Sequence, residues 1–226
     1  MKRLAISGSV DRVEYLKALC LDKVVLHLGC ANAGLTEQKI SDGSLLYLAL
    51  GSVAQAVYGV DLDARSIEIM RLHGIRNLFE GDCEHLDQLG LIERFDVLLA
   101  VNMFNYLPNP DKFLEAANTL LKPDAELVVS IDNIYSIKKL LRCFLMHREM
   151  IHPSQLWNAS PASLDRMLSH FGFAAIELCG FWAGPDIFGR QTLKSKSANR
   201  LFARLPWSPN YADGLIVRAQ LVSPVI

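Results

Sequence analysis

Residues 24–34 read Val-Val-Leu-His-Leu-Gly-Cys-Ala-Asn-Ala-Gly, and this stretch decides the fold that we predict. Its first half is a largely apolar run of strand length that ends at Gly29. Small residues fill the turn that follows. Because small residues let the backbone approach a ligand closely, such a loop at the carboxyl end of a strand indicates a ligand site.

Short apolar runs of the same kind recur along the chain and alternate with segments of helical period. They cover 56–60, 95–101, 126–131, 174–178 and 214–219. Helices are expected to start near Asp63, Asn109 and Ser160, and an N-terminal helix is expected over 11–19. Strands that alternate with helices in this way are typical of an α/β sheet with crossover helices.

The composition of the 226 residues excludes several classes of protein. Hydrophobic residues make up 51% and charged residues 21%, so the chain can bury a sizeable core and is not a disordered segment. A net charge of −1 excludes function through bulk positive charge, and nucleic acid is not an expected partner. No apolar run approaches the roughly 18 residues of a membrane span, and the first residues lack the pattern of a signal peptide.

The five cysteines are scattered along the chain and never form a C-x-x-C pair. Their spacing excludes a disulfide framework and the common zinc sites. Acids and histidines also show no metal-ligand spacing, so no metal is expected. A reducing compartment is the default for such a protein, and we expect a cytoplasmic location.

The charges are distributed unevenly. Residues 1–133 carry 12 Lys/Arg and 19 Asp/Glu, whereas residues 134–226 carry 11 and 5. Three explanations fit this pattern. The acidic and basic parts could face each other across a cleft, the basic part could bind an anionic substrate, or the surface charge could simply be uneven. Within the basic part, 134–150 has the pattern of an amphipathic helix. Such a helix is more often a lid packed on its own domain, and the alternative is contact with a membrane or a lipid-linked acceptor.

Asp61 follows the second strand, where an acid can bind two ribose hydroxyls. Gly29, Ala31 and Gly34 also fit G-x-G-x-x-G with one substitution, which makes a nicotinamide dinucleotide an alternative ligand. Two features oppose it. The methyl group of Ala31 intrudes where a pyrophosphate needs bare backbone, and Asp61 lies 32 residues after Gly29 rather than about 20.

The later motifs resemble those of the class I S-adenosylmethionine-dependent methyltransferases, in the family's order. The family's V-L-D/E-L-G-C-G-x-G strand and loop resembles residues 25–33, and its G-V-D-x-S segment resembles 59–63. Its G-D-A segment resembles 81–83, and L-L-K-P-G-G-x-L-V-V resembles 120–129. The resemblance covers residues 22–180. A narrower one is to the small methyltransferase-like proteins of polysaccharide and glycolipid gene clusters.

This resemblance implies a Rossmann-like, doubly wound, mostly parallel seven-stranded sheet with helices on both faces. It also implies S-adenosyl-L-methionine as the cofactor and a small-molecule or glycan-type acceptor. The residues that it places at the cofactor are His27, Gly29, Cys30 and Ala31 at the amino acid end, Asp61 and Leu62 at the ribose, Asp82 and Cys83 at the adenine, and Asn102.

Several residues depart from the family pattern. His27 replaces the usual acid, and a protonated imidazole there would repel the cofactor's ammonium, whereas a neutral one can accept a hydrogen bond from it. Ala31 and Ala33 replace two loop glycines. Tyr106 stands where many relatives have histidine, and Asn102 where an acid is common. A non-catalytic SAM-binding or interaction protein is therefore the alternative function.

Methyl transfer to a hydroxyl needs alignment and a base that takes the proton. His152 is the expected base, ahead of His147, because both follow the fifth strand, where such enzymes usually build the acceptor site. Either histidine has a surface or capping role as its alternative. Tyr106 is expected to contact the acceptor or to stack on the cofactor, with a core-edge position as the alternative.

We predict one methyltransferase-like domain over 1–226. Within it, residues 1–21 are expected to form an N-terminal helix. Residues 134–160 and 181–212 are expected to be lid or acceptor-site insertions. The sequence leaves the oligomeric state open.

Overall fold

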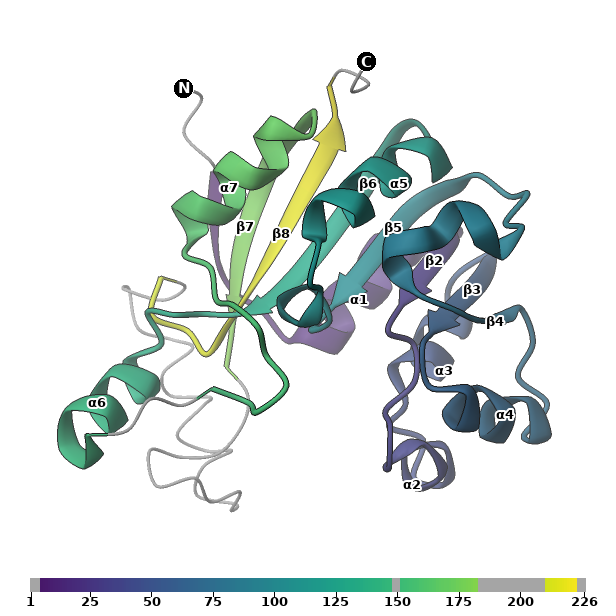
Figure 1. The fold of residues 1–226 in the computed structure, drawn as a ribbon, viewed down its shortest axis with the longest axis horizontal. Helices are drawn as coiled ribbons and strands as arrows, with labels where there is room; N and C mark the ends of the chain where they lie inside the picture. Colours follow the sequence, from purple (N-terminus) through teal and green to yellow (C-terminus); the bar gives the residue numbers. More distant parts are fainter. Residues whose placement is uncertain (1–4, 148–150, 183–209, 223–226) are drawn as a thin grey trace.

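The computed structural model describes residues 5–147, 151–182 and 210–222 (Figure 1). Its centre is one eight-stranded sheet with the order β1-β7-β8-β6-β5-β2-β3-β4. The strands are β1 (Ala5–Ser9), β2 (Val24–Leu28), β3 (Ala56–Asp61), β4 (Leu78–Glu80), β5 (Phe95–Val101), β6 (Leu121–Asp132), β7 (Phe173–Phe181) and β8 (Gly214–Leu221). The helices are α1 (Arg12–Cys20), α2 (Thr36–Ser41), α3 (Leu46–Gly51), α4 (Ala64–Leu72), α5 (Pro110–Leu120), α6 (Ile137–Met146) and α7 (Pro161–His170), with 3-10 helices η1 (Cys83–Leu89) and η2 (Phe104–Tyr106).

Neighbouring strands are parallel except where β8 runs antiparallel between β6 and β7. Helices cover both faces of this sheet (Figure 1). The predicted Rossmann-like, doubly wound and mostly parallel fold is therefore confirmed. The expected helix starts are also present, because Asp63 and Asn109 precede α4 and α5, and Ser160 forms a capping box with Ser163 at the start of α7.

The predicted count of seven strands was wrong by one, because β1 adds an eighth. β1 lies parallel to β7 at one edge of the sheet, with Ala5 opposite Glu177. Residues 1–21 therefore contain a strand before the predicted helix, which is present as α1. The Ser-Gly-Ser end of β1 gives no apolar run that sequence reasoning could detect. β1 joins the sheet through backbone hydrogen bonds to β7, because the edge of a sheet offers unpaired backbone groups.

Two apolar cores lie on opposite faces of the sheet, because successive side chains of a strand point in opposite directions. Leu26 and Leu28 belong to the core that α5, α7 and η1 cover. Val25 belongs to the core that α1, α3 and α4 cover. Both faces are thus buried, which leaves the carboxyl ends of the parallel strands as the place for a ligand.

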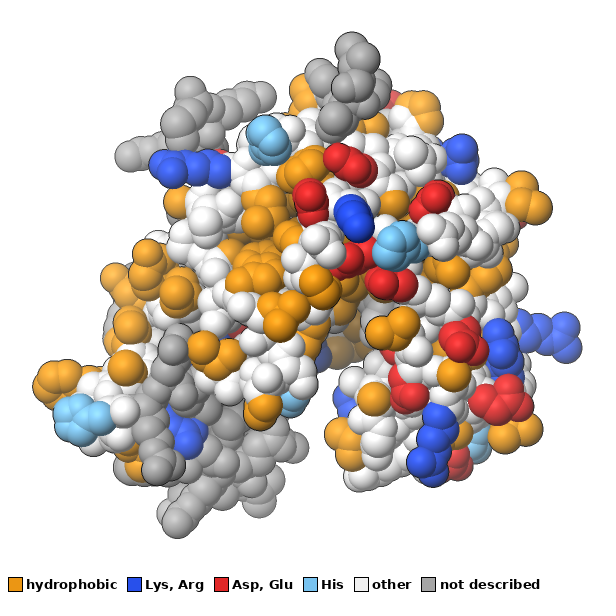
Figure 2. All heavy atoms as spheres, viewed as in Figure 1, with side chains coloured by type: hydrophobic (Ala, Val, Ile, Leu, Met, Phe, Trp, Pro, Cys, Tyr) orange, Lys and Arg blue, Asp and Glu red, His pale blue; other side chains and the backbone are white. Residues whose placement is uncertain are grey.

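The carboxyl ends of the parallel strands open into a hollow of the molecular surface. Figure 2 shows this hollow between the side of the molecule that carries α2 and α4 and the side that carries α6. The loops after β2, β3, β4 and β5 belong to adjacent strands and meet at this edge. Parallel strands therefore gather residues from four distant segments at one site.

Helix α6 stands apart from the two cores (Figure 1). Lys138 is its buried residue, and the ammonium of Lys138 pairs with Asp213 at 2.6 Å. Its apolar side chains are largely exposed: Leu140, Leu141, Phe144, Leu145 and Met146. Across the described ranges, no helix has the length and apolar character needed to cross a bilayer.

Candidate cofactor and acceptor site

The loop after β2 has a backbone that suits glycine at its first position. Gly29 has a φ of 66°, and a Cβ added there would lie 3.1 Å from Cβ of Met103. Its amide donates to the carbonyl of Val60 at 2.9 Å. A larger residue would be strained by the positive φ and would press on Met103, so this tight turn requires glycine.

Asp61 ties the β2 loop to the end of β3. Its Oδ2 accepts a hydrogen bond from the amide of Ala31 at 2.8 Å, and its Oδ1 accepts one from the amide of Asp63 at 3.0 Å. Each carboxylate oxygen keeps a further acceptor position. Leu62, which lies beside it, is exposed. Because the Ala31 amide is already bonded to a carboxylate, the loop is poorly suited to a pyrophosphate, and the dinucleotide alternative loses support.

The loop after β4 presents Asp82 and Cys83. Asp82 is the N-cap of η1, since its Oδ1 accepts from the amide of Glu84 at 2.9 Å. Its Oδ2 lies 3.4 Å from Nδ1 of His85. Cys83 is buried, and burial, assisted by the charge of Asp61, raises the pKa of its thiol to about 12. The thiol therefore stays protonated and forms part of the wall of the site.

Cys30, in the β2 loop, is buried as well. Burial, assisted by the charge of Asp61, raises the pKa of its thiol. Its sulfur lies where a Cβ on Gly59 of β3 would fall, which explains why β3 carries glycine there. Cys30 is therefore a packing residue beneath the loop and does not have the environment of a nucleophile.

His27 lies on β2 directly below the loop and is 2% exposed. Burial, with a smaller contribution from the charge of Arg12, lowers the pKa of His27 to about 4. Its ring stacks near Tyr47 at 6.4 Å, and its Nδ1 has no hydrogen-bond partner among the described residues. The imidazole is therefore neutral near pH 7 and holds an unpaired polar atom below the ligand loop.

Arg12 is a site residue that sequence reasoning missed. It opens α1, which runs antiparallel to β2, so its guanidinium lies at the carboxyl edge, 5.2 Å over the ring of Phe181. Burial lowers the pKa of Arg12, and the charges of Asp11 and Asp132 oppose that shift. Within the described ranges Arg12 makes no ion pair. A lone arginine near an N-terminus gives no sequence signal, because only the packing of α1 brings it here.

The loop after β5 borders the acceptor side of the site. Asn102 has a φ of 53°, and its Oδ1 accepts from the hydroxyl of Ser130 on β6 at 2.9 Å. Asn105 holds the segment 151–158 over this edge, since its Nδ2 donates to the carbonyl of Trp157 at 3.0 Å and its carbonyl accepts from the amide of Leu156. The segment expected to build the acceptor site is therefore attached beside Asn102.

Tyr106 and His152 come together here, with ring centroids 5.8 Å apart in an edge-to-face contact. Burial raises the pKa of Tyr106, and the nearby charge of Asp132 raises it further, so the phenol stays protonated. Nδ1 of His152 accepts from the amide of Ser154 at 3.3 Å, which places the proton of the neutral ring on Nε2. His147 instead caps the end of α6 with a φ of 52°, apart from this group.

A comparison with known families decides the assignment. Residues 21–167 match the family described as "Methyltransferase domain". This chain belongs to that family. The predicted resemblance to the class I SAM-dependent methyltransferases is thereby confirmed, and S-adenosyl-L-methionine is the cofactor that the family implies. Among the residues that the structure describes, no group of three or more His, Cys, Asp and Glu side chains is placed to hold a metal ion.

Curated proteins that this chain is similar to include the ubiquinone biosynthesis O-methyltransferase of Histophilus somni. It is 30% identical over 112 residues, which cover 44% of this chain and 47% of that protein. The enzyme of the same name from Neisseria meningitidis serogroup A is 30% identical over 130 residues, which cover 54% and 50%. The chain thus matches about half the length of these relatives.

Solved structures show the same fold at lower identity. The CcbJ methyltransferase of Streptomyces caelestis superposes with a TM-score of 0.60 at 17% identity, covering 94% of this chain and 88% of that one. A SAM-dependent methyltransferase of Archaeoglobus fulgidus gives 0.56 at 16% identity, covering 92% and 94%.

Proposed function

We propose that this chain is a SAM-dependent methyltransferase that acts on a small-molecule or glycan-type acceptor. The set of side chains at the carboxyl edge carries this proposal: a cation at Arg12, a neutral imidazole at His27 and a carboxylate at Asp61. When bound, the cofactor supplies a methyl group that its sulfonium has already activated. The protein then has to align the acceptor, exclude water and accept a proton.

The side chains match the polar groups of the cofactor in order along the edge. Arg12 is suited to a carboxylate, and the unpaired Nδ1 of His27 to an ammonium donor. Asp61 has acceptor positions left for two ribose hydroxyls. Beyond it, Asp82 and the wall residue Cys83 are assigned to the adenine. The backbone of 29–31 and the side chains of Leu62 and Asn102 complete the proposed contact set.

Tyr106 and His152 are proposed to border the acceptor. In the geometry observed, His152 offers Nε2–H as a donor, so it is suited to orient the acceptor, and it would take a proton there only after a change of tautomer. His147 remains a second candidate for the base.

Residues 134–160 and 181–212 are proposed to be the lid or acceptor-site insertions of a single domain. Of the second insertion, 183–209 lie outside the described residues. The exposed apolar side chains of α6 favour peripheral contact with a membrane or a lipid-linked acceptor. The runner-up function is a non-catalytic SAM-binding or interaction protein, which the altered loop at Ala31 and Ala33 and the absence of a histidine at Tyr106 motivate.

Calorimetric titration with S-adenosylhomocysteine tests the cofactor site. We expect Asp61→Asn, which keeps the shape of the side chain, to weaken binding roughly 10- to 100-fold, because hydrogen bonds to a charged group are lost. Asp96→Asn is the matched control, since Asp96 is a half-buried carboxylate at the opposite end of the sheet, paired with Lys122. Wild type that fails to bind at millimolar ligand would contradict the proposal.

Transfer of labelled methyl from SAM to a panel of phenols, sugars and amines then separates an enzyme from a binding protein. Binding without turnover on any acceptor would favour the runner-up. Binding of NAD in place of S-adenosylhomocysteine would favour an oxidoreductase.

A further inference from the structure

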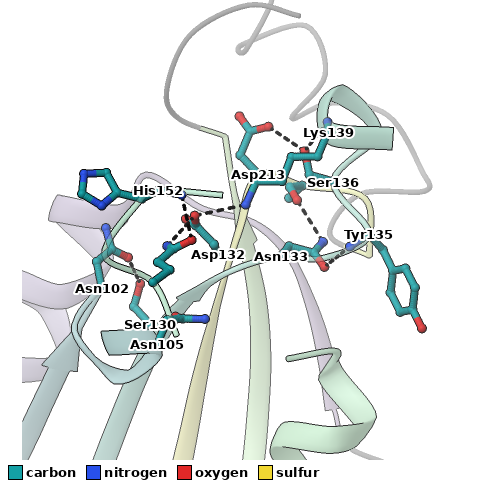
Figure 3. A network of polar contacts seen from close by, with 12 residues as sticks. Asn102, Asn105, Ser130, Asp132, Asn133, Tyr135, Ser136, Lys139, His152 and Asp213 are labelled. Atoms are coloured by element: carbon teal, nitrogen blue, oxygen red, sulfur yellow. Dashed lines mark hydrogen bonds and ion pairs between the residues drawn. The ribbon is translucent and has the colours of Figure 1, made fainter. Parts of the chain in front are cut away.

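Asp132, the last residue of β6, lies among the groups that border the acceptor side. It is two residues beyond Ser130, so both side chains point to the same face of the sheet, and Ser130 contacts Asn102. His27 also points to this face, because Val25 and Val128 belong to the core beneath it. Figure 3 shows Asp132 between His152 and Lys139, above Ser130.

One oxygen of the Asp132 carboxylate is held and the other is available. Oδ2 accepts from the ammonium of Lys139 and from Nε2 of Gln155, each at 3.0 Å. No described residue donates to Oδ1. The side chain is 38% exposed, and Oδ1 keeps its acceptor positions. Two donors from different segments thus fix the carboxylate and leave one acceptor position unused.

The two histidines are less suited to the same task. Nδ1 of His152 is occupied by the amide of Ser154, and its Nε2 carries the proton in the neutral ring. His147 lies at the far end of α6. Tyr106, next to Asp132, is a protonated phenol and therefore a donor.

We propose that Asp132 is a catalytic residue that accepts the acceptor's proton at Oδ1. This inference rests on the proposed methyltransferase function. The acceptor's O–H bond breaks and its proton passes to Oδ1, while the oxygen lone pair forms the bond to the methyl carbon. The carbon–sulfur bond breaks and its electron pair stays on sulfur, which becomes a neutral thioether. The proton then leaves Asp132 for water.

This assignment also selects the chemical class of the acceptor. A carboxylate is a weak base, and proton transfer is efficient when the two partners are matched in acidity. Oδ1 is therefore suited to an acidic hydroxyl such as a phenol and poorly suited to the aliphatic hydroxyl of a sugar.

The experiment measures methyl transfer to catechol and to the more acidic nitrocatechol by wild type and Asp132→Asn. With catechol we expect turnover to fall about 10²- to 10³-fold, and with nitrocatechol less than about 10-fold, since an acidic hydroxyl needs its base less. Binding of S-adenosylhomocysteine should change less than about threefold, which reports a folded cofactor site.

Asp213→Asn is the matched control, because Asp213 also pairs with a lysine of α6 but faces Lys138 and Ser136. It should keep turnover per folded molecule with both acceptors. Normal turnover of Asp132→Asn, equal losses on the two catechols, or wild-type activity confined to sugars would overturn the role of Asp132 alone. Wild type that binds S-adenosylhomocysteine but methylates no acceptor would remove the proposed function, and this inference with it.

Discussion

At position 27 the family's usual acid is replaced by a histidine, and the surroundings decide what that histidine can do. The sequence left open whether the ring is protonated. Burial under the ligand loop, next to the charge of Arg12, makes the protonated form unfavourable. The neutral ring removes the repulsion that would have opposed an ammonium group, so the replacement is compatible with the cofactor.

This buried imidazole makes stability depend on pH. The pKa of His27 is about 4 in the folded chain and about 6.5 when unfolded. The neutral ring therefore contributes its full stability above pH 6.5, and this stability is lost as the pH falls from about 6.5 to about 4. Because of His27, we expect the free energy of unfolding to fall by about 2 kcal/mol from pH 7 to pH 5.

Urea unfolding of wild type and His27→Gln at pH 7 and pH 5 gives the change in the free energy of unfolding for each protein. The difference between the two changes is the contribution of His27. An identical pH dependence in the two proteins would show that the fold does not lower the pKa of His27.

Sequence reasoning predicted the loop residues of the candidate site but missed Arg12 and Asp132. The loop residues follow strands, and their types fit a recognisable pattern. Arg12 reaches the site through the direction of α1, and Asp132 through the register of β6 against β5. Neither placement leaves a local signal, because each depends on how elements pack.

Among the elements, α6 departs most from ordinary packing. Its two lysines serve internal contacts, since Lys138 pairs with Asp213 and Lys139 with Asp132. The apolar residues face outward, with Phe144 79% and Leu145 58% exposed. Large apolar side chains gathered on one helix mark an interaction surface more often than scattered ones do.

If α6 contacts a lipid surface, Phe144→Glu should weaken sedimentation with phosphatidylcholine vesicles several-fold, because a charge replaces buried apolar area. The thermal stability of the Phe144→Glu variant should change little, since the side chain of Phe144 is exposed. Ile92→Glu is the control, because Ile92 is also a largely exposed apolar residue and lies in a different part of the chain. Equal losses in the two variants, or no vesicle binding by wild type, would refute membrane contact through α6.

The strands that sequence reasoning predicted are those with buried apolar runs, such as β2 and β5. The two that it missed, β1 and β4, lie at the edges of the sheet. β4 has three residues, and β1 contains Ser and Gly. Edge strands are held by backbone pairing with a neighbour more than by their own side chains, so their composition indicates little.

At the scale of the whole molecule, one polar network joins the first strand of the fold to the last ones. Glu177 on β7 accepts from Ser7, from Tyr15 at 2.7 Å and from Arg218 at 2.6 Å, and Arg218 also forms a two-bond pair with Glu126. Although burial raises the pKa of Glu177, these hydrogen bonds lower it to about 2. Both glutamates therefore stay ionised and depend on one arginine.

Removal of that arginine should be costly. We expect Arg218→Met to lower the free energy of unfolding by about 3 kcal/mol, because two partly buried carboxylates lose their cation. Tyr15→Phe removes one hydrogen bond of the same network and should cost only about 1 kcal/mol. Chemical denaturation at pH 7 measures both values. Similar losses in the two variants would contradict the central role of Arg218.

The pairing of β1 with β7 has a consequence for how the chain is made. β1 leaves the ribosome before the other described strands of this sheet, but its partner β7 is synthesised only after β2 to β6. Contacts between such distant segments form late, whereas β2 and β3 can pair as soon as both have emerged. During synthesis the segment Ala5–Ser9 therefore stays unpaired until β7 has emerged, so the strand of this sheet that is made before the others is among the last to join it.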